Sequence, residues 1–333
     1  MSKIQPSKGA PYARIMGVGG YRPTRVVPND VILETIDSSD EWIRSRSGIA
    51  TRHWASDEET VAAMSIEASG KAIADAGLTA DKIGAVIVST VSHFKQTPAV
   101  ATEIADRLGT QKAAAFDISA GCAGFGYALT LAKGMIVEGS AQHVLVIGVE
   151  RLSDLTDRED RATAFLFGDG AGAVVVGPSD VPAIGPTVWG SEGDKSETIK
   201  QTVPWTDYRD GAVERFPAIT QEGQAVFRWA VFEMAKVAKE ALDASGITAD
   251  DLDVFIPHQA NMRIIDSMVK TLKLPEHVTV ARDVETTGNT SAASIPLAME
   301  RLLATGEAKS GDTALVIGFG AGLVYAATVV TLP

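Results

Sequence analysis

Apolar and polar positions alternate along the chain in two long stretches that resemble each other. Residues 72–90 read AIADAGLTADKIGAVIVST, and residues 241–259 read ALDASGITADDLDVFIPHQ, a shift of 169 from 72 to 241. Further on, HVLVIGVE at 143–150 matches TALVIGFG at 313–320, a shift of 170 from 143 to 313. Each copy predicts an amphipathic helix, a turn with glycine, a strand rich in Val and Ile, a second helix and further apolar strands. The similar shifts predict a duplicated domain.

The predicted strands are apolar almost without interruption, so we expect helices to cover both faces of each sheet. The fold class is therefore a layered α/β architecture, with two similar halves related by a pseudo-twofold axis. Between them, residues 178–200 are rich in Gly, Pro and Ser, and we place the division at 1–184 and 185–333. The shift is far longer than the period of roughly 20–50 residues that is typical of solenoid repeats.

Composition narrows the function classes. The chain has 333 residues and a formal net charge of −12, which disfavours binding to nucleic acid. Its start lacks the apolar core of a signal peptide, and no run of about 18 apolar residues could span a bilayer. With one cysteine and five scattered histidines, neither a disulfide nor a metal site is expected. We expect a cytoplasmic protein without membrane or nucleic-acid partners.

The single cysteine lies at a predicted junction between a strand and a helix. Cys122 is flanked by Gly121, Ala123 and Gly124, which leave room for a substrate to approach the sulfur. At a helix N-terminus the free N–H groups and the helix dipole favour an anion, so we expect a thiol pKa below its ordinary value of about 8.5. The alternative is that Cys122 is a small buried apolar residue.

Two further polar residues occupy matching places in the second copy. His258 follows the strand LDVFIP, at the position that Ser89 has in the first copy, and Asn289 lies in GNTS just before a predicted helix. Alone, His258 is consistent with a structural histidine and Asn289 with a helix cap or turn. If the halves pack about a pseudo-twofold axis, however, both side chains converge with Cys122 on one shared face.

Three glycine-rich strings invite a nucleotide-binding interpretation. They are GVGG at 17–20, GDGAG at 168–172 and GFGAG at 318–322, and none has the full dinucleotide-binding pattern with its later acidic residue. We therefore interpret them as tight turns. GFGAG is the exception, because a glycine-rich loop can bring backbone N–H groups against a reacting carbonyl.

Six motifs together resemble the β-ketoacyl-acyl carrier protein synthase III family. The resemblance implies the five-layered αβαβα thiolase fold, a homodimer, and a catalytic triad of Cys122, His258 and Asn289. The motifs run in family order and are DSSDEWIRSRSGI (37–49), DISAGCAGF (117–125), FGDGAGA (167–173), PHQANMRII (257–265), GNTSAAS (288–294) and GFGAGL (318–323).

This resemblance implies an acyltransferase that initiates fatty-acid synthesis. Cys122 would take the acyl group from an acyl-CoA primer, and malonyl-acyl carrier protein would then lose CO₂ and attack the acyl-enzyme. Neutral His258 and Asn289 would hold the malonyl thioester oxygen during decarboxylation. The backbone N–H groups of Cys122 and Ala321 would form the oxyanion hole, although many relatives have glycine at the latter position. No cofactor is implied beyond the coenzyme A thioester substrate.

The family pattern also implies where coenzyme A binds. Trp42, Arg46 and Arg161 fall where relatives hold the adenine and the phosphates, and Asn261 falls where they contact the pantetheine arm. An exposed Trp could otherwise serve ordinary packing.

Three basic residues, Arg263, Arg228 and Lys270, are expected to form a patch for the acidic carrier protein, with a solvated helix face as the alternative. The acyl pocket is expected to include Phe167 and Thr97 of the partner subunit. Acetyl-primed relatives often have Phe at the position of Thr97, so the smaller side chain favours branched or longer primers.

Other functions compete with this interpretation. The nearest is a related Cys-His-Asn starter or ester-forming enzyme of polyketide or quinolone biosynthesis, which malonyl-carrier dependence and CO₂ release would distinguish. A non-catalytic dinucleotide-binding module would rest on the glycine strings alone. A purely structural thiolase-like subunit would be expected to lack the cysteine.

Overall fold

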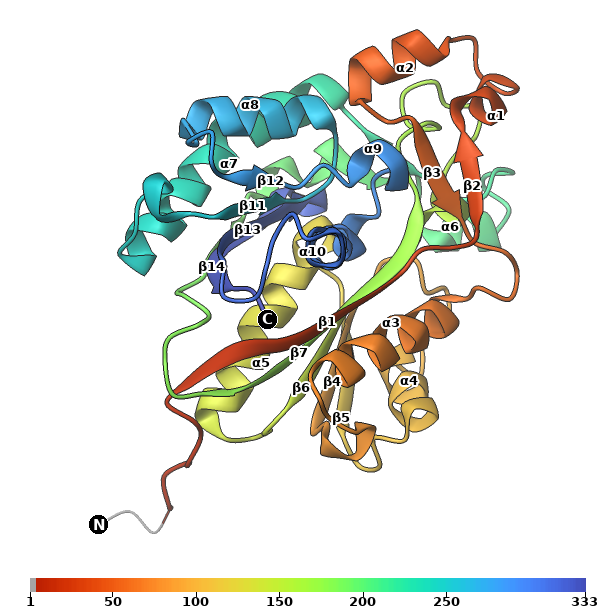
Figure 1. Ribbon diagram of the computed structural model, residues 1–333. Coiled ribbons are helices and arrows are strands. Elements are labelled where there is room, and N and C mark those ends of the chain that lie inside the picture. Colours follow the sequence, from red (N-terminus) through yellow and green to blue (C-terminus); the bar gives the residue numbers. More distant parts are fainter. Residues whose placement is uncertain (1–3) are drawn as a thin grey trace.

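Two five-stranded sheets form the centre of the computed structural model, which describes residues 4–333 (Figure 1). In both sheets the first three strands pair antiparallel and the remaining pairs are parallel. This shared order and direction confirms two similar halves. The first sheet runs β1 (Tyr12–Tyr21), β7 (Asp169–Ser179), β6 (Val144–Arg151), β4 (Ala85–Ser89) and β5 (Ala114–Ile118), and the second runs β8 (Val188–Ser191), β14 (Val324–Thr331), β13 (Thr313–Gly320), β11 (Val254–Pro257) and β12 (Thr279–Val280).

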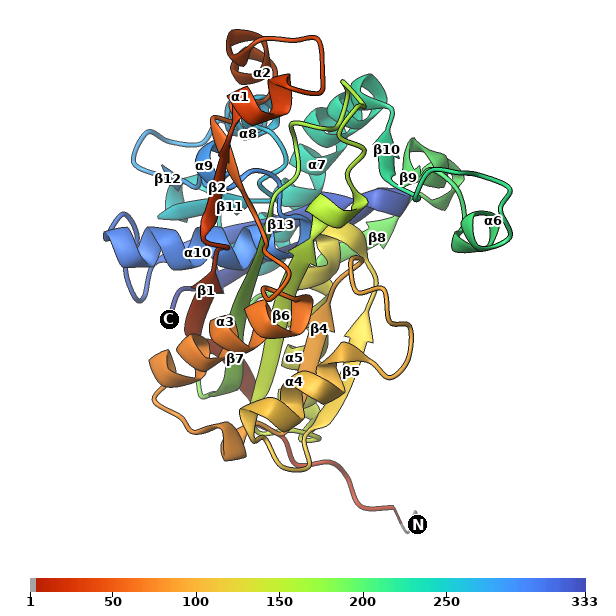
Figure 2. The ribbon, with the colours of Figure 1, turned by 90° about the vertical axis from the view of Figure 1, so that its right-hand side faces the viewer.

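Six helices complete five layers. Figures 1 and 2 show how these helices lie between and outside the sheets. Two lie between the sheets, and their apolar residues share one core with both sheets. The other four cover the outer faces, two on the first sheet and two on the second. The expected five-layered αβαβα thiolase-like fold is thereby confirmed. The inner helices are α5 (Gly124–Glu138) and α10 (Ser294–Thr305), and the outer ones are α3 (Val61–Asp75), α4 (Val100–Leu108), α7 (Gly223–Ser245) and α8 (Met262–Leu272).

Strand β4 shows why helices cover both faces. Its sequence AVIVS is buried at every position. Ile87 packs into the core between the sheets, whereas Val86 and Val88 pack under α3 and α4. Because successive strand residues point to opposite faces, an uninterrupted apolar strand requires cover on each side.

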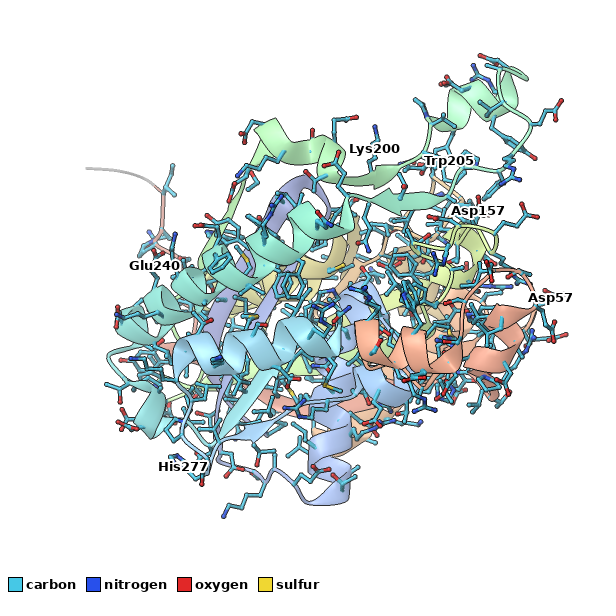
Figure 3. All side chains as sticks on the ribbon, turned by 90° about the horizontal axis from the view of Figure 1, so that it is seen from above. Asp57, Asp157, Lys200, Trp205, Glu240 and His277 are labelled. Carbon is cyan, nitrogen blue, oxygen red and sulfur yellow. The ribbon has the colours of Figure 1, made fainter. Side chains whose placement is uncertain are left out.

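Smaller elements surround the layers. One lobe has its own apolar cluster and contains β2 (Arg25–Pro28), α1 (Asn29–Leu33), α2 (Asp40–Ser47), β3 (Thr51–Trp54) and α9 (Val284–Thr287). An excursion of β9 (Ile199–Gln201), α6 (Trp205–Arg209) and β10 (Ile219–Gln221) projects from the body in Figure 2, and Figure 3 labels Lys200 and Trp205 on it. Short 3₁₀ turns are η1 (Ala80–Lys82), η2 (Gly121–Ala123), η3 (Leu152–Leu155), η4 (Gly193–Thr198), η5 (Ala249–Asp251), η6 (Ser291–Ala293) and η7 (Ala321–Leu323).

The interpretation of GVGG and GDGAG as tight turns is wrong. GVGG lies inside β1, and GDGAG runs into β7. A Cβ at Gly17 would stand 2.4 Å from the backbone N of Ala76, and one at Gly19 would stand 2.2 Å from the carbonyl oxygen of Ala68. These glycines let helix α3 lie directly on the strand, a close backbone approach that a side chain would prevent.

The two halves meet through a symmetric pair of glycine contacts. Gly148 in β6 abuts η6, where a Cβ on this glycine would stand 2.1 Å from the carbonyl oxygen of Ala292. Gly318 in β13 abuts η2, where a Cβ would stand 2.8 Å from the carbonyl oxygen of Cys122. Each half thus presses a strand against the turn of the other half, and one of these turns carries the cysteine.

The chain passes from the first sheet to the second between Ser179 and Val188. The division into residues 1–184 and 185–333 stays a prediction. Within residues 4–333, no helix is both long enough and apolar enough to cross a bilayer.

The glycine contacts yield a test. We expect Gly148→Ala and Gly318→Ala each to lower the free energy of unfolding, measured in urea, by about 1–3 kcal/mol or more, because the added methyl overlaps backbone atoms. Gly134→Ala is the matched control, since a Cβ there has no atom within 4 Å inside α5. It should raise stability by roughly 0.5–1 kcal/mol. A Gly148→Ala variant as stable as the wild type would contradict the account.

Candidate active site

Cys122 lies in the middle of η2, immediately before helix α5 begins at Gly124. The turn starts at Gly121, whose φ of 49° is in the left-handed region that glycine tolerates best. Cys122 keeps part of its surface open and lines a cavity of about 210 Å³. The predicted position just before a helix is therefore what the structure shows.

His258 and Asn289 reach the same cavity from the second half. His258 follows β11, and Asn289 lies between α9 and η6. Both line the cavity with Cys122, as does Ala321 of η7. The predicted convergence on one face is present, and it arises because β11 and η6 belong to the half that packs onto η2.

The imidazole of His258 is held in a dry setting. Only 2% of the residue is exposed, and burial lowers the pKa of His258 to about 3. Its Nδ1 lies 2.7 Å from Oγ of Ser294, and its ring meets that of Phe319 edge to face, with centroids 5.4 Å apart. His258 is therefore neutral at physiological pH.

Asn289 is fixed by its backbone and by its side chain. Its N–H donates to the carbonyl oxygen of Leu166 at 2.9 Å, and its own carbonyl accepts from the N–H of Gly168 at 3.0 Å. Its Oδ1 accepts from the N–H of Ser291 at 2.9 Å. Since Oδ1 is occupied, the amide Nδ2 is the group left to donate to a ligand.

The expectation of a low thiol pKa is wrong. Burial raises the pKa of Cys122 to about 12, and the charge of Glu150 adds to the rise. Hydrogen bonding from the Ser291 side chain and from the backbone acts in the opposite direction. The sequence shows the helix N-terminus but not the walls that exclude water, so it misses the larger effect.

The end of β13 and the start of η7 close over the sulfur. A Cβ on Gly320 would stand 2.9 Å from Sγ of Cys122, and the backbone N of Ala321 lies 3.4 Å from the Cβ position of Gly121. The turns η2 and η7 are thus in direct contact. Two backbone segments with N–H groups border the place where a thioester would meet Cys122.

A second, outer cavity of about 540 Å³ adjoins the first. The two cavities share the side chains of Gln221, Val226, Ala260, Ile264 and Asn289 in their linings. A long substrate can therefore enter through the outer cavity and extend to the sulfur.

Cationic and aromatic side chains gather at one part of the outer cavity, around Trp42. Trp42 and Arg46 line it, and the guanidinium groups of Arg161 and Arg46 lie 4.8 and 5.8 Å from the centre of the Trp42 ring. Phe165 meets Trp42 edge to face with centroids 5.5 Å apart. Stacked rings and guanidinium groups suit a ligand with an aromatic base and phosphates.

Comparison with known proteins decides the family. Models of 3-oxoacyl-[acyl-carrier-protein] synthase III and of its C-terminal part match residues 116–193 and 242–332. A β-ketoacyl-[acyl-carrier-protein] synthase III of Streptomyces glaucescens is 90% identical over 100% of both chains. The mycobacterial synthase III of Mycobacterium marinum is 55% identical over 100% of this chain and 99% of the relative. The chain belongs to the β-ketoacyl-[acyl-carrier-protein] synthase III family.

Solved structures agree with this family. The priming β-ketosynthase of the R1128 polyketide pathway superposes with a TM-score of 0.97 at 46% identity, over 100% of this chain and 99% of the other. The synthase III of Aquifex aeolicus gives a TM-score of 0.88 at 37% identity, over 96% and 99%. The protein is thus an acyltransferase of fatty-acid biosynthesis, a condensing enzyme that forms β-ketoacyl-acyl carrier protein.

Asn261, which was predicted to contact pantetheine, lines the outer cavity and also stabilises the local structure. It caps helix α8, with Oδ1 accepting the N–H of Arg263 at 2.9 Å, and its Nδ2 donates to the carbonyl oxygen of Arg46 at 3.0 Å. Arg263 and Arg228 line the same cavity. Lys270 is exposed further along α8 and does not line it.

Two residues were predicted for the acyl pocket, and that assignment stays a prediction. Phe167 lines the inner cavity, whereas Thr97 is exposed and does not line the cavity of its own subunit. Sequence reasoning missed the apolar wall of Val91, Leu152 and Leu155, because no periodic pattern marks the turns that carry them. It also missed Glu150 and Ser291. The sequence did contain one signal for Glu150, because a charged residue near the end of an otherwise apolar strand is unusual.

Among residues 4–333, no group of three His, Cys, Asp or Glu side chains is placed to hold a metal ion. The expectation that the enzyme works without a cofactor stays a prediction.

Because His258 is neutral in the folded protein, the free energy of unfolding should depend on pH. Its folded pKa is depressed, so the unfolded chain binds a proton that the folded protein does not, and stability falls as pH falls below about 6.5. Between pH 6 and 4, the wild type should lose about 2 kcal/mol more than His258→Gln, measured by urea unfolding. Parallel losses in the two proteins would show that His258 is protonated in the folded state.

Proposed function

We propose that Cys122 is the nucleophile that carries the acyl group, with His258 and Asn289 as its catalytic partners. The observation that supports this most is that the only cysteine of the chain shares one cavity with a neutral histidine and with an amide group free to donate. The substrates are an acyl-CoA primer and malonyl-acyl carrier protein.

In acylation the Cys122 sulfur attacks the primer thioester, the bond to the coenzyme A sulfur breaks, and the thiol proton leaves with coenzyme A. The backbone N–H groups of Cys122 and Ala321 are assigned as the oxyanion hole. Their turns border the sulfur, and preorganised backbone donors in a dry site stabilise developing charge strongly. Alanine suffices at residue 321 because the donor is backbone.

In decarboxylation the malonyl thioester oxygen gains negative charge as CO₂ leaves. His258 and Asn289 each supply one N–H to that oxygen. Oγ of Ser294 accepts the N–H of Gln259 at 3.3 Å, so its own proton can go to Nδ1 of His258. The ring proton then resides on Nε2, from which it can be donated to a substrate in the cavity. The resulting carbanion attacks the acyl group on Cys122 and forms the new carbon–carbon bond.

Coenzyme A occupies the outer cavity in this proposal. Trp42 stacks on adenine, Arg46 and Arg161 bind phosphates, and Asn261 contacts pantetheine. Support comes from the cation–ring stacks around Trp42 and from the continuity of the two cavities.

For the acidic carrier protein we assign Arg263, Arg228 and Lys270. All three are exposed, and the first two stand at the rim through which the pantetheine arm must pass.

A homodimer completes the acyl pocket in this proposal. Strand β5 lies at the edge of the first sheet with one side unpaired, which is a natural place for a second copy to add its own edge. Thr97 of the partner subunit then limits the pocket beside Phe167 and favours branched or longer primers. A cytoplasmic location stays a prediction that the single cysteine favours.

A second candidate is a starter enzyme of polyketide biosynthesis, favoured by the TM-score of 0.97 with the R1128 priming ketosynthase. The 90% identity to the Streptomyces glaucescens synthase III outweighs that 46% match. The preferred primer and carrier distinguish the two.

The test separates the two half-reactions. Each protein is incubated with a panel of acyl-CoA primers and labelled malonyl-acyl carrier protein, and acyl-enzyme mass, CO₂ and condensed product are recorded. Cys122→Ala should form no acyl-enzyme and no product. His258→Ala and Asn289→Ala should still become acylated but lose at least about 100-fold in CO₂ release, since each removes a donor to the developing oxyanion.

Wild type should give β-ketoacyl-carrier product and rank branched or longer primers first. Acylation without condensation would favour the related starter or ester-forming enzyme of polyketide or quinolone biosynthesis. Condensed product from Cys122→Ala would exclude Cys122 as the nucleophile.

A further inference from the structure

Glu150 is a buried carboxyl group beside the nucleophile that no step above employs. It is the second-last residue of β6 and is 0% exposed. Its carboxylate accepts hydrogen bonds from Oγ of Ser92 at 2.6 Å, from the N–H of Val91 at 3.1 Å and from Oγ1 of Thr90 at 3.3 Å. Such a set of donors fixes the carboxylate in one place, two residues beyond the contact that Gly148 makes with η6.

Ser291 lines the inner cavity together with Cys122, and the turn η6 that it begins abuts strand β6 at Gly148, two residues before Glu150. Its side chain acts on both groups, since it lowers the pKa of the Cys122 thiol and that of the Glu150 carboxyl group against the larger effect of burial. Ser291 is 4% exposed and has a φ of 48°, a left-handed conformation that is unusual for serine. Oδ1 of Asn289 accepts its N–H and holds it there. Strained residues that the surroundings hold in place gather at functional sites.

The charged groups around Glu150 do not neutralise it. Arg151, next in sequence, pairs with Asp154 at 3.0 Å. On the adjacent strand, Asp169 accepts from the backbone N–H of Ala55 and from the Ser153 side chain. Within residues 4–333 no cation lies at salt-bridge distance from Glu150, and the histidine that shares the cavity with the sulfur is neutral.

Burial therefore raises the pKa of Glu150 to about 7, and its charge raises the pKa of Cys122. The charge of Glu150 therefore affects how readily Cys122 loses its proton.

The reaction needs a proton at this place. When the carbon–carbon bond forms, the bond between the acyl carbon and the Cys122 sulfur breaks and leaves a thiolate. Loss of CO₂ from malonate supplies no proton, so each turnover takes one proton from water. A buried carboxyl group next to the sulfur can pass that proton on.

We propose that Glu150 is a positioning residue that controls the protonation of Cys122 through the Ser291 hydroxyl. As a carboxylate it adds to the effect of burial and helps to keep the resting sulfur protonated. In its protonated form it returns a proton by way of Ser291 when the thiolate leaves the product, and it then regains a proton from water. This role rests on the proposed role of Cys122 as nucleophile.

The lone cysteine makes the test direct, because iodoacetamide alkylation of the native enzyme, followed by intact mass, reports Cys122 alone. Glu150→Gln removes the charge and keeps the size. We expect its alkylation at pH 8 to be at least about tenfold faster than that of wild type, since one pH unit in a thiol pKa is tenfold in thiolate. Ser291→Ala should be slower than wild type, because a hydroxyl that stabilises the thiolate is lost.

Asp169→Asn is the matched control, a buried carboxyl on the next strand whose pKa burial raises to about 6. Its alkylation rate should equal that of wild type. A faster rate in Asp169→Asn would show that loss of a buried carboxylate loosens the fold in general and exposes Cys122. Equal rates for wild type and Glu150→Gln would overturn the proposal. If Glu150→Gln does not fold, an unchanged rate in Ser291→Ala overturns it instead. Alkylation of the thiol does not depend on catalysis, so this test is independent of the proposed role of Cys122 as nucleophile. If that role were wrong, Cys122→Ala would still form condensed product.

Discussion

The contact between strand and turn at two glycines is the constraint on which the site depends. Gly148 and Gly318 have no side chain, so the backbone of each half reaches the turn of the other half. Any larger residue would push η2 and η6 away from the strands. The candidate active site depends on these two turns, which belong to different halves and line one cavity.

The site lies between the halves and is largely buried, and burial sets its charges. Burial keeps the imidazole of His258 neutral and the Cys122 thiol protonated, and it raises the pKa of Glu150 to about 7. Charge then develops mainly during the reaction, on thioester oxygens that backbone and side-chain N–H groups can bind. In such a site those donors stabilise charge more than they would in water, because no solvent competes for it.

The sequence predicted the architecture and the residues that line the cavity, but not the electrostatic properties of the site. The shifts of 169 and 170 predicted two halves, because both copies kept the same order of elements. Local sequence patterns gave wrong predictions at positions whose structure is determined by packing against distant parts of the chain. The glycines of β1 read as a turn, since the helix lying on them is absent from a local window. The thiol pKa and the role of Glu150 depend on which walls exclude water, and no spacing of residues reveals those walls.

The most direct test of the account is a single turnover with labelled acyl-CoA in the absence of malonyl substrate, followed by proteolysis and peptide mapping. The account predicts one labelled peptide, which contains Cys122, and one equivalent of free coenzyme A for each acylated subunit. Label on any other residue, or release of coenzyme A without label on the protein, would contradict it.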